Sequence, residues 1–319
     1  MYDTPETLKA LSAGIFLTLL LVLVSGIFPI GIVSIWLIPL PVLFYRARLN
    51  RNFASLIPLS IIFFMVIIGR GFTLDLLFLS GLLLLGFLLS ESFERLFSLE
   101  QTILFSCGGV FAAGCLVLFF YSIIANIGYV ELISQSVDKS IALTLEIYKE
   151  IGALDEQRVT VAESRDTFIL ILTRFLPGIT AVLLIFSAWI NILVAGSIFH
   201  RHNISFAGYG QLKLWQAPDK LVWPTIICIT SFIMIQIEII QVISFNIIMV
   251  LMLVYFLQGI AITGFFFDKK RIPKGLKILL YGLMIYTGIL ILFVIGIGFF
   301  DMWVNFRKPG TDKTGTLND

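Results

Sequence analysis

The sequence predicts an all-α membrane protein, a polytopic transmembrane helix bundle of about nine spans with one external amphipathic helical segment. Three observations predict this class. Of the 319 residues, 59% are hydrophobic and 13% are charged, and the mean hydropathy of +1.02 exceeds that of soluble domains. Apolar runs of about 20 residues, the length that crosses the hydrocarbon core, recur along the chain. Between two of these runs lies a polar segment whose apolar residues have helical spacing.

The apolar runs define the predicted spans in chain order. They cover residues 9–28, 29–47, 53–69, 73–92, 101–126, 167–198, 221–243, 245–267 and 275–300. The second run contains Pro29, Pro39 and Pro41, and proline removes a backbone donor and clashes with the preceding turn. We therefore expect this run to cross the membrane as a distorted helix or to form a re-entrant segment. If it does not cross, the orientation of every later span is inverted, and with it the side of the C-terminus.

Lysine and arginine predict the orientation, because short cytoplasmic loops retain an excess of both. One face receives most of them: Lys9, Arg46, Arg48, Arg51, Arg95, Arg201, Lys213, Lys220, Lys269, Lys270, Arg271, Lys274 and Lys277. We therefore expect a cytoplasmic N-terminus. The chain divides into N-terminal transmembrane helices at 1–126, an external connection at 127–166, C-terminal transmembrane helices at 167–303 and a polar tail at 304–319.

The connection at 127–166 has the pattern of an amphipathic helix. Its apolar residues recur every three or four positions, at Ile133, Val137, Ile141, Leu145, Tyr148 and Ile151. One interpretation is an interfacial helix on the bilayer surface, and the other is a lid over an external opening between the spans. The connection carries more acidic than basic residues, which favours packing against protein over attraction to anionic lipid.

Several function classes lack support in the sequence. Cys107, Cys115 and Cys228 lie in apolar runs without CxxC spacing, so disulfides and zinc sites are not expected. His200 and His202 are alternate residues without an adjacent acidic or cysteine ligand, and we expect no metal. Protease, hydrolase, nucleotide-binding and calcium-binding motifs are all absent. We therefore expect no enzyme activity and no cofactor, and the net charge of +2 gives no reason to expect nucleic-acid binding.

Polar side chains within the predicted spans are candidates for function, because they are costly at depth and normally face other helices or a cavity. Arg174 and Glu238 are predicted at similar depth in the outer leaflet, with Gln241 sharing the face of Glu238. Arg70 and Asp75 fall near the same surface, at the junction of the third and fourth spans. We hypothesise that these residues form an external polar pocket in which Arg174 pairs with Glu238. Snorkelling of Arg174 to the interface is the alternative.

Deeper in the bilayer, Asn191 and Gln258 extend the hypothesised substrate site. Gln258 is 11 residues from Lys269, or roughly 16 Å of helical rise, which places it near mid-bilayer. Both side chains are equally compatible with helix packing, in which an amide hydrogen-bonds to a neighbouring helix and Gly178 or Gly259 permits close approach.

Four segments of the C-terminal half carry a resemblance to a family. They are "FLPGITAVLLIFSAWINILVA" from Phe175, "LKLWQAPDKLVW" from Leu212, "NIIMVLMLVYFLQGIAITGFFFDKKRIP" from Asn246 and "FFDMWVNFRK" from Phe299. In these segments the chain resembles the YybS-like family of predicted bacterial multi-pass membrane proteins. The resemblance implies no catalytic residue, because no biochemical activity comes with the family.

The hydrophobic layout is also similar to the substrate-binding subunits of energy-coupling-factor vitamin transporters. That likeness implies a small-molecule site near the external face beneath a loop lid. It also implies a transmembrane coupling subunit and an ATPase as partners, contacted through small residues of the first helix. Ala10 and Gly14 supply a single small pair here, where the transporter pattern has two alanines. Nine spans would also exceed the six of that fold.

The leading hypothesis is therefore small-molecule recognition or transport by a multi-pass protein of the bacterial inner membrane, as the substrate-binding subunit of a multi-chain importer. The alternative is a non-catalytic scaffold or assembly protein that binds other membrane proteins. Besides the lipid bilayer, the first hypothesis requires a small-molecule ligand as partner, and the second requires another protein.

Overall fold

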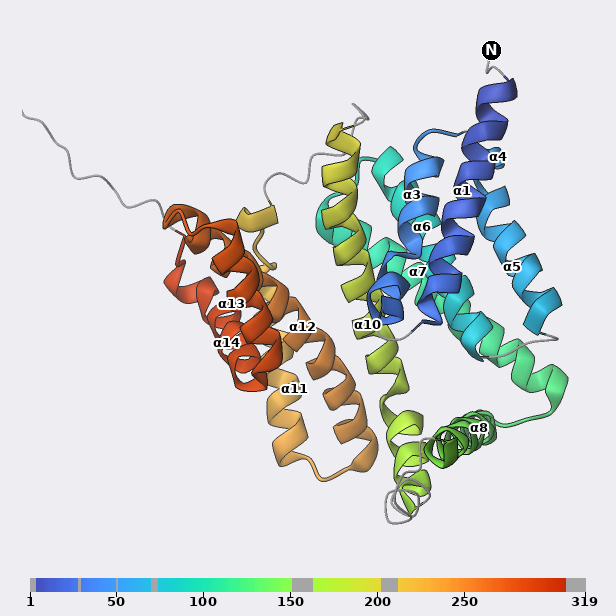
Figure 1. Ribbon diagram of the computed structural model, residues 1–319. Coiled ribbons are helices and arrows are strands. Elements are labelled where there is room, and N and C mark those ends of the chain that lie inside the picture. The colour runs from blue at the N-terminus through green and yellow to red at the C-terminus, as the bar shows by residue number, and fades with distance from the viewer. Residues whose placement is uncertain are drawn as a thin grey trace, which may run out of the picture. The chain divides into compact units, whose positions relative to one another are not determined.

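The computed structural model describes residues 4–27, 30–49, 51–69, 74–150, 163–201 and 212–307, and across these ranges the chain is helical with no strand. The predicted all-α class is confirmed. The chain forms two compact units, Met1–Gly208 and Tyr209–Asp319, which we describe one at a time (Figure 1).

The first unit begins with α1 (Thr4–Ser25), followed by a broken helix in place of the predicted second span. The broken helix consists of α2 (Ile30–Ser34), the 3₁₀ turn η1 (Ile35–Leu37) and α3 (Pro39–Arg46). Pro39 and Pro41 explain it, because neither supplies an N–H to the preceding turn. Proline is tolerated at the start of α3 for the same reason.

The remaining helices of this unit follow in sequence order. They are α4 (Arg51–Ala54), α5 (Leu56–Gly69), α6 (Leu74–Glu94), α7 (Leu99–Ala125), α8 (Tyr129–Glu150) and α10 (Arg165–Arg201). A capping box starts α7: the Ser98 hydroxyl accepts from the N–H of Gln101, and the Gln101 side chain accepts from the N–H of Ser98. Asn126, in the left-handed conformation with φ of 52°, ends it.

The core of the first unit lies where α3 packs between α1 and α6. Val42 and Leu43 of α3 and Leu83 and Leu85 of α6 are fully buried. Gly86 allows this contact, because a Cβ there would lie 2.4 Å from the carbonyl oxygen of Pro39. Gly14 has a similar position on α1, where a Cβ would meet Ile57 Cδ1 at 2.7 Å.

The second unit contains η2 (Leu212–Leu214), η3 (Asp219–Leu221), α11 (Val222–Met234), α12 (Glu238–Lys269), α13 (Lys274–Tyr286) and α14 (Gly288–Val304). The boundary predicted between 243 and 245 is wrong. The chain turns at Ile235–Ile237 instead, where Ile235 and Ile237 are extended, and α12 then continues through residue 244 without a break. Figure 1 shows α11 and α12 as a hairpin joined by this turn.

Nine spans are not confirmed by the described helices. Among the described residues, five helices are long and apolar enough to cross a membrane: Glu6–Ser25, Leu76–Glu94, Leu99–Ala125, Arg165–Phe199 and Glu238–Lys269. A sixth candidate combines Lys274–Met284 with Gly288–Val304, which are bent by 104°. The other predicted spans correspond to apolar helices too short to pass this test, including Ile35–Arg46 and Leu56–Ile67. Five or six candidate spans are therefore supported among the described residues. Run length does not register where a helix breaks.

Candidate functional site

The amphipathic helix α8 forms the candidate site together with the N-terminal part of α10. Figure 1 shows α8 lying across this end of α10, and α8 buries Ile133 and Val137. The predicted helical pattern of the connection is thus confirmed over Tyr129–Glu150, whereas its external location stays a prediction. Ile151, the last residue of the pattern, lies outside the described residues.

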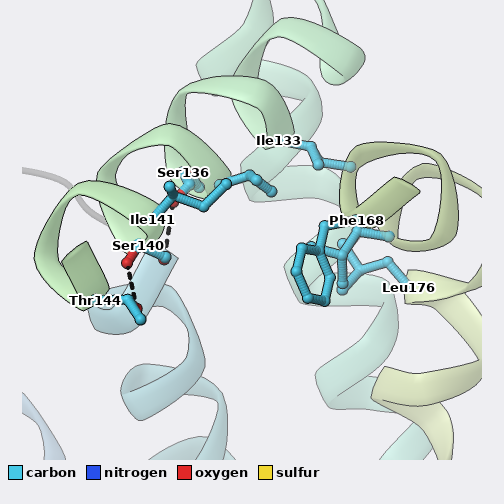
Figure 2. Close-up of a pocket in the computed structure, with 9 residues that line it drawn as sticks. Ile133, Ser136, Ser140, Ile141, Thr144, Phe168 and Leu176 are labelled. Carbon is cyan, nitrogen blue, oxygen red and sulfur yellow. Dashed lines mark hydrogen bonds between the residues drawn. The ribbon is translucent and has the colours of Figure 1, made fainter. Parts of the chain in front are cut away.

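A pocket of about 370 Å³ lies between these two helices. Figure 2 shows side chains of both helices facing it. The lining consists of Ile133, Ser136, Val137, Ser140, Ile141 and Thr144 of α8 with Phe168, Leu172 and Leu176 of α10. The pocket is therefore mostly apolar, with a row of three hydroxyl groups along α8.

The hydroxyl groups of this row all donate to the backbone of their own helix. Ser136 donates to the carbonyl oxygen of Leu132 at 2.9 Å, and Thr144 donates to that of Ser140 at 2.8 Å. Ser140 donates in the same way to the carbonyl oxygen of Ser136 at 2.9 Å (Figure 2). A hydroxyl has one proton and two lone pairs, so these groups offer the pocket acceptors only.

An ion pair joins the two helices beside the pocket. Arg165, the first residue of α10, donates from Nε to Asp138 Oδ1 at 2.5 Å and from Nη2 to Asp138 Oδ2 at 3.0 Å. Its Nη2 also donates to Ser134 Oγ at 3.0 Å. The hydrogen bonds from Arg165 lower the pKa of the Asp138 carboxyl. The pair is bidentate and links α8 to α10, although solvent screens it because both side chains are more than 40% exposed.

In the second unit, Gln258 belongs to a buried polar network. Its Nε2 donates to Asp301 Oδ2 at 3.1 Å, and its Oε1 accepts from the N–H of Ala217 at 3.3 Å. Arg307 donates to Asp301 Oδ2 at 2.6 Å and to the carbonyl oxygen of Trp215 at 2.8 Å. The network therefore connects α12, the end of α14 and the segment after η2 through side chains that are all buried.

Close helix contact accompanies this network. A Cβ on Gly259 would lie 2.1 Å from the carbonyl oxygen of Val294, and one on Gly298 would lie 2.0 Å from that of Tyr255. The glycines thus let α12 and α14 meet backbone to backbone.

In the first unit, Asn191 bridges α10 to the broken helix. Its Nδ2 donates to the carbonyl oxygens of Trp36 and Ser187, both at 2.7 Å. The carbonyl of Trp36 lies in η1, three residues before Pro39. The amide therefore satisfies an acceptor at a break that proline creates.

A second buried charge cluster was not among the predicted site residues. Arg46, with a side chain 0% exposed, donates to Glu91 Oε2 at 2.5 Å and to Glu94 Oε1 at 2.8 Å. Arg95 also binds Glu91, at 2.9 Å. In the sequence, Arg46 and Arg95 indicated only the orientation of the chain, although Glu91, within the apolar run before Arg95, indicates a buried partner.

The other predicted site residues are distributed over both units. Arg174 lies on α10 in the first unit, whereas Glu238 begins α12 in the second, with Gln241 one turn later. The Arg174–Glu238 pair therefore stays a prediction. Arg70 lies outside the described residues, as does the side chain of Asp75. Gly178 is buried on α10, and Ala10 of α1 packs against the core of the first unit.

No metal centre appears among the residues that the structure describes, because no three His, Cys, Asp or Glu side chains there lie close enough to hold an ion. His202 lies outside those residues.

The long apolar helices define a multi-pass membrane protein, and their exposed outer faces agree with this class. Phe63 of α5, Ile124 of α7 and Ile233 of α11, for example, are 69%, 82% and 70% exposed, which suits contact with lipid. The family of predicted membrane proteins designated DUF2232 matches residues 15–302, and the chain belongs to this family. Comparisons with curated proteins and with solved structures give no match.

Proposed function

We propose that this membrane protein recognises or transports a small molecule that binds in the pocket between α8 and α10. The observation that carries the proposal is the pocket itself. Its volume of about 370 Å³ falls within the usual range for small-molecule sites, roughly 300–1,000 Å³. Its apolar lining with a few polar groups is typical of such sites. In this proposal α8 acts as the lid that the amphipathic sequence suggested.

The same proposal includes the membrane, the orientation and the partner chains of the protein. The protein would act without catalysis in the bacterial inner membrane, with a cytoplasmic N-terminus and a coupling subunit and ATPase supplied by other chains. Its resemblance to YybS-like proteins and its layout, similar to energy-coupling-factor subunits, support this setting. Asn191 and Gln258, both of which the hypothesis placed in the substrate site, have hydrogen-bond partners on neighbouring segments. The pocket rather than these amides is therefore the proposed binding site.

Native mass spectrometry of the purified protein tests the proposal. Ile141→Trp would fill the pocket, whereas Leu143→Trp places the same side chain on the same helix at a position that is 52% exposed and not part of the lining. We expect a small molecule to remain bound to the wild type and to Leu143→Trp and to be lost from Ile141→Trp. Equal retention by all three proteins would contradict a site in this pocket.

A scaffold role is the second candidate, and the buried polar networks favour it. The Gln258–Asp301–Arg307 network and the Asn191–Trp36 bond connect separate segments, which is what a rigid platform for other membrane proteins requires. If the wild type carries no small molecule and instead co-purifies with another membrane protein in defined stoichiometry, the scaffold role replaces the first proposal.

A further inference from the structure

We infer that the pocket between α8 and α10 takes an aliphatic chain that ends in an uncharged hydrogen-bond donor, as in a long-chain alcohol. This inference rests on the proposed function and names the class of ligand for that site. Three properties of the pocket carry it: its apolar walls, the direction of its hydroxyl protons and the charges around it.

The walls suit an aliphatic chain. Ile133, Val137 and Ile141 approach from α8, and Phe168, Leu172 and Leu176 approach from α10 (Figure 2). Each set recurs at four-residue spacing, so each forms a continuous apolar strip along its helix. The two strips face each other where α8 lies across α10 (Figure 1), and burial of an apolar chain there is favourable in proportion to the apolar area removed from water.

The hydroxyl row selects the polar end of the ligand. Ser136, Ser140 and Thr144 each use their only proton on a backbone carbonyl of α8. Their remaining lone pairs can accept a hydrogen bond from an O–H or N–H of the ligand. A carboxylate or phosphate is acceptor-only when ionised, so it would have to break one of these intrahelical bonds to gain a partner.

Charge argues against an ionised end of either sign. The nine residues of the lining carry no charged side chain, so an ion entering the pocket would lose its hydration without a counter-charge. Arg165 is bound to Asp138 and Asp166. Lys139 and Lys149 of α8 are exposed, and neither they nor Arg174 of α10 belong to the lining. The acidic residues Glu131, Glu146 and Glu150 of α8 are exposed and would further repel an anion. An uncharged donor avoids both costs.

Photoaffinity labelling of the full-length protein in neutral lipid nanodiscs tests the inference. Three probes share one diazirine-bearing alkyl chain and differ only in the end group: alcohol, carboxylate or primary amine. At pH 8 we expect the alcohol to label α8 and the N-terminal part of α10, with competition by unlabelled alcohol. The carboxylate should label these segments at least about five-fold less, the equilibrium effect of one hydrogen bond. The amine, which is protonated at pH 8, should also label less than the alcohol, because it would lose its hydration without a counter-charge in the lining.

Matched variants separate this inference from the proposed function. Ile141→Trp should abolish pocket labelling by all probes, whereas Leu143→Trp should leave it unchanged. Ser140→Ala removes one acceptor without filling the pocket. It should reduce labelling by the alcohol but not labelling by an alkane probe of the same chain length. The test therefore does not depend on whether Ile141→Trp folds. Labelling that is the same in wild type, Ile141→Trp and Leu143→Trp would overturn both the inference and the pocket as binding site. Pocket labelling by the carboxylate or the amine that equals labelling by the alcohol would overturn the inference alone.

Discussion

Gly298→Ala should separate α12 from α14, because the added methyl group would lie 2.0 Å from the carbonyl oxygen of Tyr255 and 2.9 Å from the backbone nitrogen of Gly259. Cβ atoms essentially never come within 3.0 Å of such neighbours, so the helices must separate locally by about 1 Å. Both obstructing atoms belong to the backbone, and no rotamer change can relieve the contact.

The magnitude follows from two costs. Overpacking of a close contact costs about 1–3 kcal/mol. Moving α14 away also lengthens the bond from Gln258 Nε2 to Asp301 Oδ2, now 3.1 Å, beyond hydrogen-bonding distance, which costs about 1–2 kcal/mol more. We therefore expect Gly298→Ala to lower the free energy of unfolding of the second unit by about 2–5 kcal/mol.

Gly296 supplies the control on the same helix. A Cβ there has no neighbour within 4 Å, so Gly296→Ala should be neutral or should stabilise the protein by up to about 1 kcal/mol, through the reduced entropy of the unfolded chain. Denaturant titration of both variants in one detergent measures the difference, followed by fluorescence in a background in which Trp303 is the one tryptophan kept of the five. If Gly298→Ala is as stable as Gly296→Ala, the backbone contact between α12 and α14 does not exist in the protein.

Three further predictions concern the first unit. Arg46→Met removes the donor to Glu91 Oε2, while Arg95 still binds Oε1, and should lower the free energy of unfolding by about 1–3 kcal/mol. The control Arg201→Met, at an exposed position, should lower it by at most about 0.5 kcal/mol, and equal stability of the two variants would contradict a buried Arg46–Glu91 pair. Asn191→Asp places an acceptor against the carbonyl oxygens of Trp36 and Ser187 and should destabilise the unit by about 2–3 kcal/mol more than Asn191→Leu, and equal denaturation midpoints would refute this. The lowered pKa of Asp138 means that its bond with Arg165 contributes stability above about pH 3.9, the usual pKa of an aspartate, and that this contribution is lost as the pH falls through the lower pKa of the folded state. Amide-exchange protection of α8, corrected for intrinsic rates, should therefore decrease below about pH 4, and this decrease should be smaller in Asp138→Asn.

The sequence was sufficient for the class of the protein and for most of its helices. Apolar run length predicted the helices that became α1, α6, α7 and α10, because a chain in lipid must satisfy its backbone hydrogen bonds within helices. The periodicity at Ile133, Val137 and Ile141 predicted α8 for a different reason, since one face of this helix must be buried.

Helix boundaries were less predictable than the helices themselves. The turn at Ile235–Ile237 contains Gln236 and is followed at once by Glu238. The sequence-based prediction took these polar residues as one face of a continuous span and placed the boundary near residue 244. Pro39 and Pro41 indicated in the sequence that the helix is interrupted, but not how the freed carbonyl groups are satisfied. The carbonyl of Trp36 accepts from Asn191, which is 155 residues away in the chain.

For the candidate site, too, some features follow from the sequence and others only from the tertiary structure. Sequence alone determined that polar residues at depth, such as Gln258 and Asn191, must face protein or a cavity, because lipid offers them no hydrogen-bond partner. Only the tertiary structure decided which partners they have: Asp301 and Ala217 for Gln258, and Trp36 for Asn191. It also decided that the pocket lies between α8 and α10, since a cavity is set by how two helices pack and not by the residues of either helix.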